Sequence, residues 1–265
     1  MKKNIEQFLQ ESSVDAFLPI LKEKEAVELY SLSFQEVENI ALKNSITPLR
    51  YKRNQSTISI ENQLKLLNSH VAIVGCGGLG GHVAEILARI GIGNLKLFDF
   101  DIFEEHNLNR QNFSNYNCLN KKKVLVVKEA LELISPSLHV EAFVKKFNPF
   151  EDMNMLQNVD IVVDALDNPK TKLDLAFTCK EKNIAFVHGA IAGMTGQFTT
   201  SNTLENLYRD KGFGIEKSVG NPSFSVTFAA SIQGAEVIKT VLNIGNTLKN
   251  QILLTDLVEN EFITL

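Results

Sequence analysis

The sequence V-A-I-V-G-C-G-G-L-G-G occupies residues 71–81. Its apolar start, 71–75, ends at a glycine and predicts a buried strand. Gly75, Gly77 and Gly80 have the spacing G-x-G-x-x-G, and residues 82–90 continue with the apolar spacing of a helix. Glycine lets a backbone approach a phosphate closely, and a helix N-terminus supplies free N–H groups. The stretch therefore predicts a strand, a nucleotide-binding turn and a helix.

Strand and helix patterns alternate through the rest of the chain. We predict further strands at 95–99, 138–144, 160–166, 184–189, 196–201 and 252–257, and further helices at 121–134, 168–182 and 221–243. Such alternation is typical of an α/β fold. The expected architecture is Rossmann-like, with a mostly parallel sheet covered by helices on both faces.

Residues 1–50 differ from the rest of the chain in composition and pattern. They are polar and helix-prone, and Ser33 with Glu36 has the form of a capping box at a helix start. We interpret 1–50 as an N-terminal helical extension and 51–265 as the main domain.

Composition excludes several classes of protein. The net charge of −4 argues against non-specific nucleic-acid binding, which needs a basic face. No apolar run approaches the roughly 20 residues of a membrane span, and the N-terminus lacks the apolar stretch of a signal peptide. We therefore expect a cytoplasmic protein that binds neither nucleic acid nor membrane. The three cysteines are far apart and form no C-x-x-C pair, so no zinc site is expected.

The residues after the glycine loop bear on which nucleotide binds. Asp99 ends the next predicted strand, where a carboxylate can bind ribose hydroxyls. Up to this point a nicotinamide-dependent oxidoreductase remains an alternative. Arg110 and the lysines at 121–123 then stand where the phosphates would lie, and such cations suit a triphosphate better than a nicotinamide.

An ordered set of motifs covers the chain from Tyr51 to its end. They are Y-K-R-N (51–54), G-C-G-G-L-G-G (75–81), D-F-D (99–101), N-L-N-R-Q (107–111), Lys123, D-A-L-D-N (164–168) and G-A-I-A-G-M-T-G-Q-F (189–198). With these motifs the sequence resembles the MoeB/ThiF/HesA-type adenylyltransferases, a family in the superfamily of the ubiquitin-activating enzymes.

The resemblance implies a role for individual residues. Arg53 would reach the ATP site of the other subunit of a homodimer, and Asp167 would hold Mg²⁺. Arg110 and Lys123, with Asn107, would contact the phosphates of ATP. The remaining residues implied to bind the nucleotide are Gly75, Gly77, Gly78, Gly80, Asp99, Asp101 and Asn168.

The resemblance also implies a reaction. The chain would use ATP to adenylate the C-terminal carboxylate of a small ubiquitin-like sulfur-carrier protein ending in Gly-Gly, with release of pyrophosphate. A relative that activates a modified tRNA base or a peptide is a further alternative. The pathway, of molybdopterin or thiamine type, stays open.

The chain departs from the family in its cysteines. Many members carry two C-x-x-C pairs and a cysteine in the crossover loop, and this chain has neither. We expect no zinc and a separate sulfur donor. Residues 202–221 are expected to form a mobile loop over the site. Cys179 is expected in the core, whereas Cys118 is the one cysteine that could reach an activated carbonyl, from a mobile segment. His188 is given no role.

Overall fold

The computed structural model describes residues 4–201, 204–208 and 219–265. The described residues form an eight-stranded sheet in the order β10-β9-β8-β7-β6-β3-β4-β5. Its strands are β3 (His70–Val74), β4 (Asn94–Asp99), β5 (His139–Val144), β6 (Ile161–Asp164), β7 (Ala185–Ala192), β8 (Thr195–Thr199), β9 (Leu253–Asp256) and β10 (Glu261–Thr264). The strands from β5 to β7 are parallel, and β8, β9 and β10 continue the sheet in antiparallel pairs.

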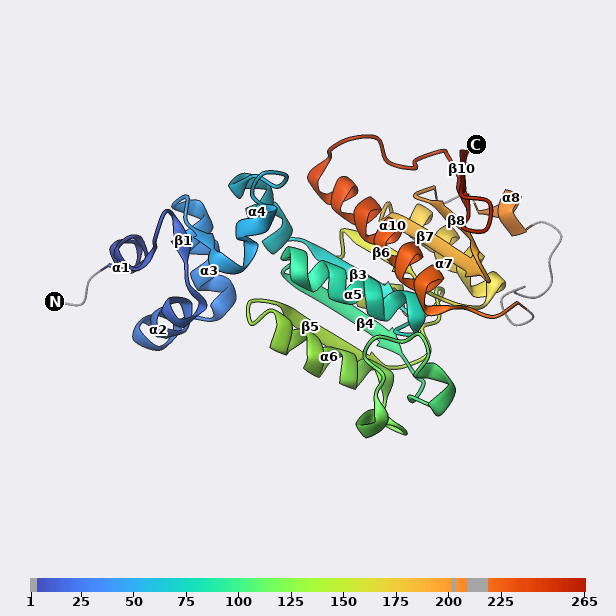
Figure 1. Cartoon of the computed structure of the whole chain (residues 1–265), viewed down its shortest axis with the longest axis horizontal. Helices are drawn as coiled ribbons and strands as arrows, with labels where there is room; N and C mark the ends of the chain where they lie inside the picture. Colours follow the sequence, from blue (N-terminus) through green and yellow to red (C-terminus); the bar gives the residue numbers. More distant parts are fainter. Residues whose placement is uncertain (1–3, 202–203, 209–218) are drawn as a thin grey trace.

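The helices lie on both faces of this sheet (Figure 1). The long helices of the main domain are α5 (Gly78–Ile90), α6 (Lys123–Ile134), α7 (Pro169–Glu181) and α10 (Ser223–Leu242). The shorter helices are α4 (Ile60–Leu67), α8 (Glu205–Tyr208), η2 (Glu105–Asn107), η3 (Tyr116–Cys118) and η4 (Met153–Leu156). The predicted α/β fold with a mostly parallel sheet is confirmed.

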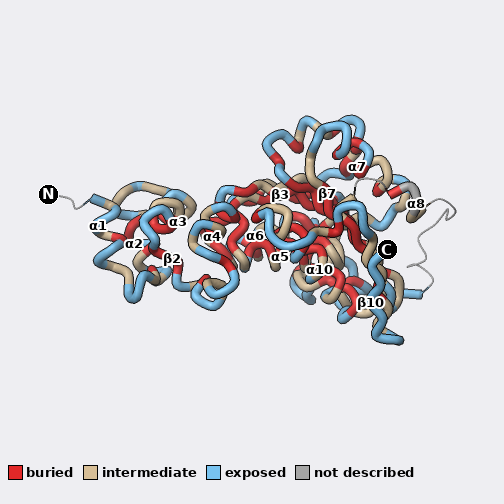
Figure 2. The backbone as a smooth tube through the Cα atoms, turned by 90° about the horizontal axis from the view of Figure 1, so that it is seen from above, coloured by how far each residue is buried: buried red, intermediate tan, exposed pale blue. Residues whose placement is uncertain are grey.

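The alternating direction of side chains along each strand explains how one sheet carries a layer of helices on each face. In β3, Val71 and Ile73 belong to the apolar cluster that holds α5, α6 and α10, whereas Ala72 and Val74 belong to the cluster that holds α7. Successive side chains of a strand point to opposite faces, so a strand covered on both sides is apolar throughout. Figure 2 shows buried residues concentrated in this layered part of the chain.

The N-terminal residues form a separate apolar cluster. Its elements are α1 (Ile5–Ser12), β1 (Phe17–Leu18), α2 (Ile20–Tyr30), α3 (Phe34–Lys43) and β2 (Thr47–Pro48), followed by the 3₁₀ helix η1 (Leu49–Asn54). Leu9, Leu18 and Val37 are completely buried in this cluster. The predicted capping box is present: the Ser33 hydroxyl accepts from the Glu36 N–H, and the Ser33 N–H donates to the Glu36 carboxylate.

Arg50 connects this cluster to the main domain. Its guanidinium donates to both carboxylate oxygens of Glu23 at 2.8 Å, to Glu38, and to the Ser137 hydroxyl at 3.1 Å. Glu23 lies on α2 and Glu38 on α3, and both are completely buried. One arginine therefore compensates two buried carboxylates and also reaches the segment before β5.

The structure differs from the sequence prediction at several element ends. Helix α5 begins at Gly78 rather than at residue 82, because the glycine loop itself forms the first helical turn. β7 continues past Gly189 to Ala192. The strand pair β1–β2, helix α4 and strand β10 were not predicted. The loop expected over the site falls mostly on residues outside the described ranges.

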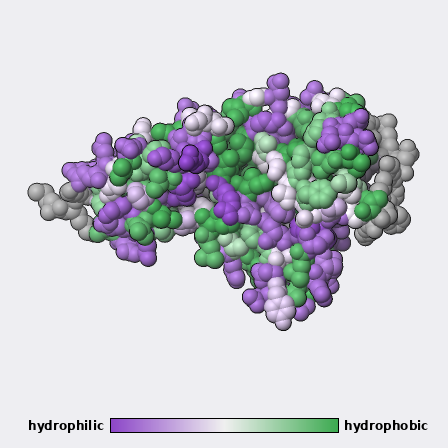
Figure 3. Space-filling model, in the orientation of Figure 1, coloured by the Kyte–Doolittle hydropathy of each residue, from purple (hydrophilic) through white to green (hydrophobic). Residues whose placement is uncertain are grey.

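On the face seen in Figure 3, hydrophobic and hydrophilic side chains are interspersed over the main domain. Among the described helices, none combines the length and the apolar character that crossing a lipid bilayer requires.

Candidate active site

A cavity of about 500 Å³ lies where the parallel strands β3, β4 and β6 end. The chain places β4 and β5 on one side of β3 and then β6 and β7 on the other, so the strand order reverses here. Open α/β sheets bind ligands at such a point. The predicted site residues that line this cavity are Gly75, Gly77, Gly78, Asp99, Asp101, Asn107, Arg110, Lys123, Asp167 and Asn168.

The glycine loop is shaped by close backbone contacts. Gly75 has φ +101°, in the left-handed region, and an added Cβ would lie 2.5 Å from the Ala165 carbonyl oxygen. Gly80 is outside the cavity lining; an added Cβ there would lie 1.8 Å from the Gly75 carbonyl oxygen. Gly80 thus allows α5 to pack against the loop, while Gly75, Gly77 and Gly78 face the cavity.

The Gly80→Ala variant is expected to lower the free energy of unfolding by about 3 kcal/mol, because backbone atoms cannot yield to the new methyl group. The matched control is Gly78→Ala, whose new carbon would lie 3.1 Å from a Val226 side-chain methyl group and so meets no backbone atom at closer range. Urea denaturation of both variants measures the difference. Equal stabilities would contradict the packing role of Gly80.

Asp99 ties the end of β4 to the glycine loop. Its Oδ2 accepts from the Cys76 N–H and its Oδ1 from the Asp101 N–H, each at 2.7 Å. Burial raises the pKa of Asp99, opposed by these two donors and by Lys123. Each carboxylate oxygen keeps a further lone pair, so Asp99 can still accept from a ligand hydroxyl.

Two cations face the cavity from different elements. Arg110 follows η2, and its Nη1 donates to the His106 carbonyl at 3.0 Å and to the Asn109 side chain at 2.8 Å. Lys123 begins α6 and is 7% exposed, with its Nζ 3.4 Å from Asp101 Oδ2. Within the described residues Arg110 forms no ion pair with a carboxylate. Its charge is therefore available to an anionic ligand.

Asp167 and Asn168 form the turn between β6 and α7. Asn168 accepts from the Thr171 N–H at 3.0 Å, with Pro169 as the next residue, so the predicted start of α7 is confirmed. The Asp167 side chain is exposed. It has neither a hydrogen bond nor an ion pair within the described residues, which leaves its carboxylate open to a ligand or a cation.

Sequence reasoning missed several residues of this cavity. Lys145 and Lys146 directly follow β5, so the rule that ligands bind at the carboxyl ends of strands could have found them. The Lys146 ammonium lies 5.9 Å from the centre of the Phe100 ring. Gln111 belongs to the motif N-L-N-R-Q, and its Oε1 is buried without a hydrogen-bond partner. The other missed polar residues of the lining are Glu104, His106, Thr171 and Asn221.

Arg53 does not line the cavity of its own chain. It lies on η1, and its neighbour Tyr51 contacts Gly91 at the C-terminal end of α5. The cavity is at the other end of that helix. The Arg53 side chain is exposed, and within the described residues it makes no ion pair.

The cysteines are all buried. Cys179 lies in the core on α7, as predicted, and burial raises its pKa to about 12. Cys118 is 4% exposed and accepts from the Asn115 N–H at 3.0 Å within η3. The polar residues before α6 fold into a 3₁₀ turn around the sulfur, and Cys118 does not line the cavity.

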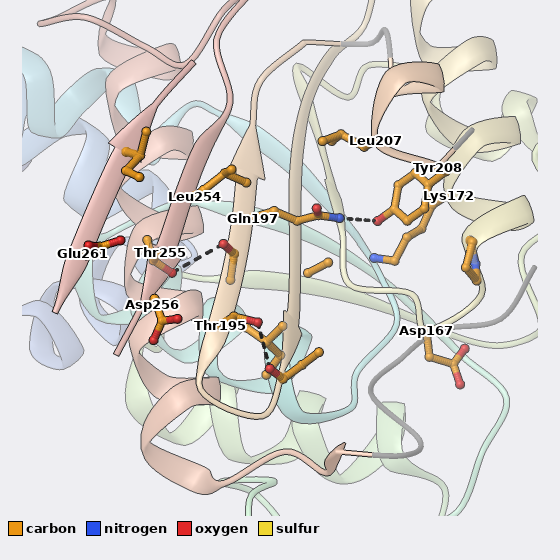
Figure 4. Close-up of a pocket in the computed structure, with 16 residues that line it drawn as sticks. Asp167, Lys172, Thr195, Gln197, Leu207, Tyr208, Leu254, Thr255, Asp256 and Glu261 are labelled. Atoms are coloured by element: carbon orange, nitrogen blue, oxygen red, sulfur yellow. Dashed lines mark hydrogen bonds between the residues drawn. The ribbon is translucent and has the colours of Figure 1, made fainter. Parts of the chain in front are cut away.

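A second cavity of about 390 Å³ adjoins the first (Figure 4). Asp167 and Ile191 line both. The second cavity lies over the antiparallel strands β7 to β10 and is bounded by α8. Leu207 and Tyr208 contribute from α8, and Glu261 and Ile263 from β10. This cavity was not predicted, because it depends on the pairing of β10 and on the position of α8.

A glycine loop, a carboxylate at the next strand end and cations at a topological switch point define a nucleotide-binding α/β protein. The ThiF family model matches residues 51–265. The chain is 34% identical over 220 residues to the molybdopterin-synthase adenylyltransferase of Haemophilus influenzae, covering 78% of this chain and 90% of that protein. It is 31% identical over 192 residues to the adenylyltransferase and sulfurtransferase MOCS3 of Arabidopsis thaliana, covering 69% of this chain and 41% of that longer protein.

Among solved structures, E. coli MccB has a TM-score of 0.70 with 25% identity, over 82% of this chain and 68% of that one. The chain belongs to the ThiF family. The expected adenylyltransferase class is confirmed.

Proposed function

We propose that this protein uses ATP and Mg²⁺ to adenylate the C-terminal carboxylate of a small ubiquitin-like sulfur-carrier protein in the cytoplasm, releasing pyrophosphate. One observation carries the proposal: Asp167 lines both the cavity at the glycine loop and the second cavity. The two substrates of an adenylation would meet there. The name of the Haemophilus influenzae relative supports an acceptor of the sulfur-carrier class.

The chemistry of the lining fits this reaction. A carboxylate must approach the α-phosphorus of ATP while pyrophosphate leaves, so negative charge meets negative charge. In the proposal Arg110, Lys123 and Asn107 bind the phosphates and stabilise the charge of the transition state. The loop glycines, with Asp99, Asp101 and Asn168, hold the rest of the nucleotide.

Mg²⁺ fits the donors that the cavity offers. Mg²⁺ in nucleotide sites is held by one or two carboxylates together with substrate phosphates. The parts of the chain that the structure describes contain no cluster of three metal-ligating side chains. Asp167, with an unpaired carboxylate on the cavity wall, matches the single-carboxylate arrangement, and the metal would add positive charge at the phosphates.

The second cavity suits the end of an acceptor chain. Its volume of about 390 Å³ admits an extended tail but no folded domain. Small side chains, Ala190, Ala192 and Gly196, line the side formed by β7 and β8. We therefore propose that a tail ending in Gly-Gly enters over these strands and brings its carboxylate to Asp167.

A homodimer and a separate sulfur donor complete the proposal. Arg53 is exposed and far from the cavity of its own chain, as a residue that serves the partner subunit would be. The buried Cys118 and the raised pKa of Cys76 and Cys179 give no accessible thiolate within the described residues. An external thiol would attack the acyl-adenylate.

Exchange of labelled pyrophosphate into ATP tests this function. We expect exchange only with Mg²⁺ and with a carrier protein whose Gly-Gly carboxylate is free. The matched control is the same carrier with one residue added after the second glycine. Exchange that is supported instead by short peptides would change the acceptor class. A rise in melting temperature with NAD and none with ATP would contradict the proposal.

A further inference from the structure

A buried chain of polar groups lies at the carboxyl ends of β6 and β7. Asp164 ends β6 and is completely buried, Lys172 on α7 is 3% exposed and His188 on β7 is 1% exposed. The Lys172 ammonium donates to both Asp164 oxygens at 3.3 and 3.2 Å and to the Gly189 carbonyl at 3.2 Å. His188 Nδ1 lies 2.7 Å from Asp164 Oδ2. A buried ion pair often adds little net stability, so we infer that this pair matters for the groups that it positions.

The protonation states follow from these contacts. Burial alone would raise the pKa of Asp164, but Lys172 and His188 hold it below its ordinary value. Burial lowers the pKa of His188, so the imidazole is neutral. An ionised carboxylate can only accept, and Nδ1 must therefore carry the hydrogen. Nε2 is then left as an acceptor.

Nε2 of His188 accepts a hydrogen bond from Tyr208. The Tyr208 hydroxyl lies 3.2 Å from His188 Nε2 and therefore donates to it. The same oxygen accepts from the Gln197 side-chain amide of β8 at 3.1 Å (Figure 4). A continuous series of hydrogen bonds thus runs from the salt bridge, through His188, to a residue that lines the second cavity.

Helix α8 depends on such an anchor. It has a single turn, Glu205–Tyr208, and an isolated turn is not stable by itself. Leu204, completely buried, holds its start in the apolar cluster under α7, and Tyr208 holds its end. Because Leu207 and Tyr208 form one wall of the second cavity, the position of α8 sets the width of that cavity.

The same aspartate also shapes the turn that carries Asp167. Asp164 Oδ1 accepts from the Leu166 N–H at 3.0 Å, and the Asp164 carbonyl accepts from the Gln233 side chain at 2.9 Å. Two parts of the lining of the second cavity, the Asp167 turn and α8, are therefore connected to one buried carboxylate.

We propose that His188 and Tyr208 are positioning residues, which hold α8 at the distance from Asp167 that the tail of the acceptor requires. The acceptor part of this proposal rests on the proposed function; the anchoring of α8 does not. Neither side chain reacts, and their effect on the reaction passes through the wall that they fix.

Two variants remove the hydrogen bond between Tyr208 and His188, each by changing one of the two partners. Tyr208→Phe keeps the ring and loses the hydroxyl. His188→Asn places an amide where Nδ1 stood, so it keeps the bond to Asp164 and loses the acceptor for Tyr208. Tyr116→Phe, at a tyrosine that is 84% exposed, is the matched control.

We expect both variants to raise the KM for the acceptor by roughly 10-fold, the effect of one buried hydrogen bond, with kcat and the Kd for ATP unchanged. Tyr208→Phe also removes the bond from Gln197, so the double variant should be no worse than Tyr208→Phe alone, which already lacks the bond to His188. Equal KM values for wild type and both variants would overturn the role in setting the cavity.

Two measurements test whether His188 and Tyr208 anchor α8, and neither of them needs the acceptor protein. Nitrogen-15 NMR should show His188 as the neutral Nδ1–H tautomer, and amide hydrogen exchange at Leu207 and Tyr208 should be faster in both variants than in Tyr116→Phe. An Nε2–H tautomer, or unchanged exchange rates, would overturn the proposal. If no carrier or peptide supports pyrophosphate exchange, the proposed function fails alone, and these two readouts still decide whether His188 positions α8.

Discussion

Asp167→Asn is expected to lower pyrophosphate exchange by roughly 100-fold or more, because it removes the carboxylate proposed to hold Mg²⁺ at the phosphates. The new side chain has nearly the same shape, and the native carboxylate is exposed and unpaired within the described residues. The melting temperature should therefore stay unchanged. Glu151→Gln, at an exposed carboxylate that lines neither cavity, is the matched control.

Arg110→Ala and Lys123→Ala should show losses of the same order, since both act on the same developing charge. Exchange near the wild-type rate in any one of the three variants would remove that residue from the proposed site.

A mixing experiment separates the proposed role of Arg53 from the others. Chains with Arg53→Ala and chains with Asp167→Asn should both be inactive alone. After subunit exchange, a mixed dimer should regain about one active site, since one of its two sites receives an intact Arg53 and an intact Asp167. No recovery, in a preparation shown to exchange subunits, would mean that Arg53 does not serve the partner.

The second large effect is expected at Arg50. Arg50→Met should lower the free energy of unfolding by about 3–5 kcal/mol at pH 8, because two completely buried carboxylates, Glu23 and Glu38, lose their only compensating cation in the described structure. Arg53→Met makes the same chemical change on the same 3₁₀ helix at an exposed position. It should leave the stability within about 0.5 kcal/mol of wild type in urea denaturation.

The loss at Arg50 should shrink in acid. Burial raises the pKa of Glu23 and of Glu38 above 4.5, against the opposing effect of Arg50. In the window above 4.5 the folded chain therefore binds more protons than the unfolded chain, and these two groups lower the stability as pH rises. Without Arg50 the pKa values rise further, and the window widens. A loss from Arg50→Met that is as large at pH 5 as at pH 8 would contradict this account.

The main domain could be predicted because its signals are local. Each buried strand is an apolar run that ends at a glycine or a polar residue, and each long helix has an N-cap or a periodic apolar face. Gly75, Asp99, Arg110 and Lys123 were found because strand ends of a parallel sheet meet at one edge. Sequence spacing alone places such residues near one another.

The rest depends on contacts between distant segments. No sequence pattern singled out Arg50, and only the packing of α2 and α3 shows that it compensates two buried glutamates. His188 looked like an ordinary strand-end histidine, because its partners Asp164 and Tyr208 are 24 and 20 residues away. No local pattern reports such partners.

The wall between the two cavities has a thermodynamic consequence. Asp167 and Ile191 line both cavities, so we expect the free energy of binding a ligand in one cavity to depend on whether the other is filled. Such coupling is reciprocal: the factor by which nucleotide changes the affinity for the acceptor equals the factor by which acceptor changes the affinity for nucleotide. In the proposed reaction both ligands are anionic where they would meet at Asp167, so the sign of that coupling would be set by the positive charge near this residue when the second ligand binds.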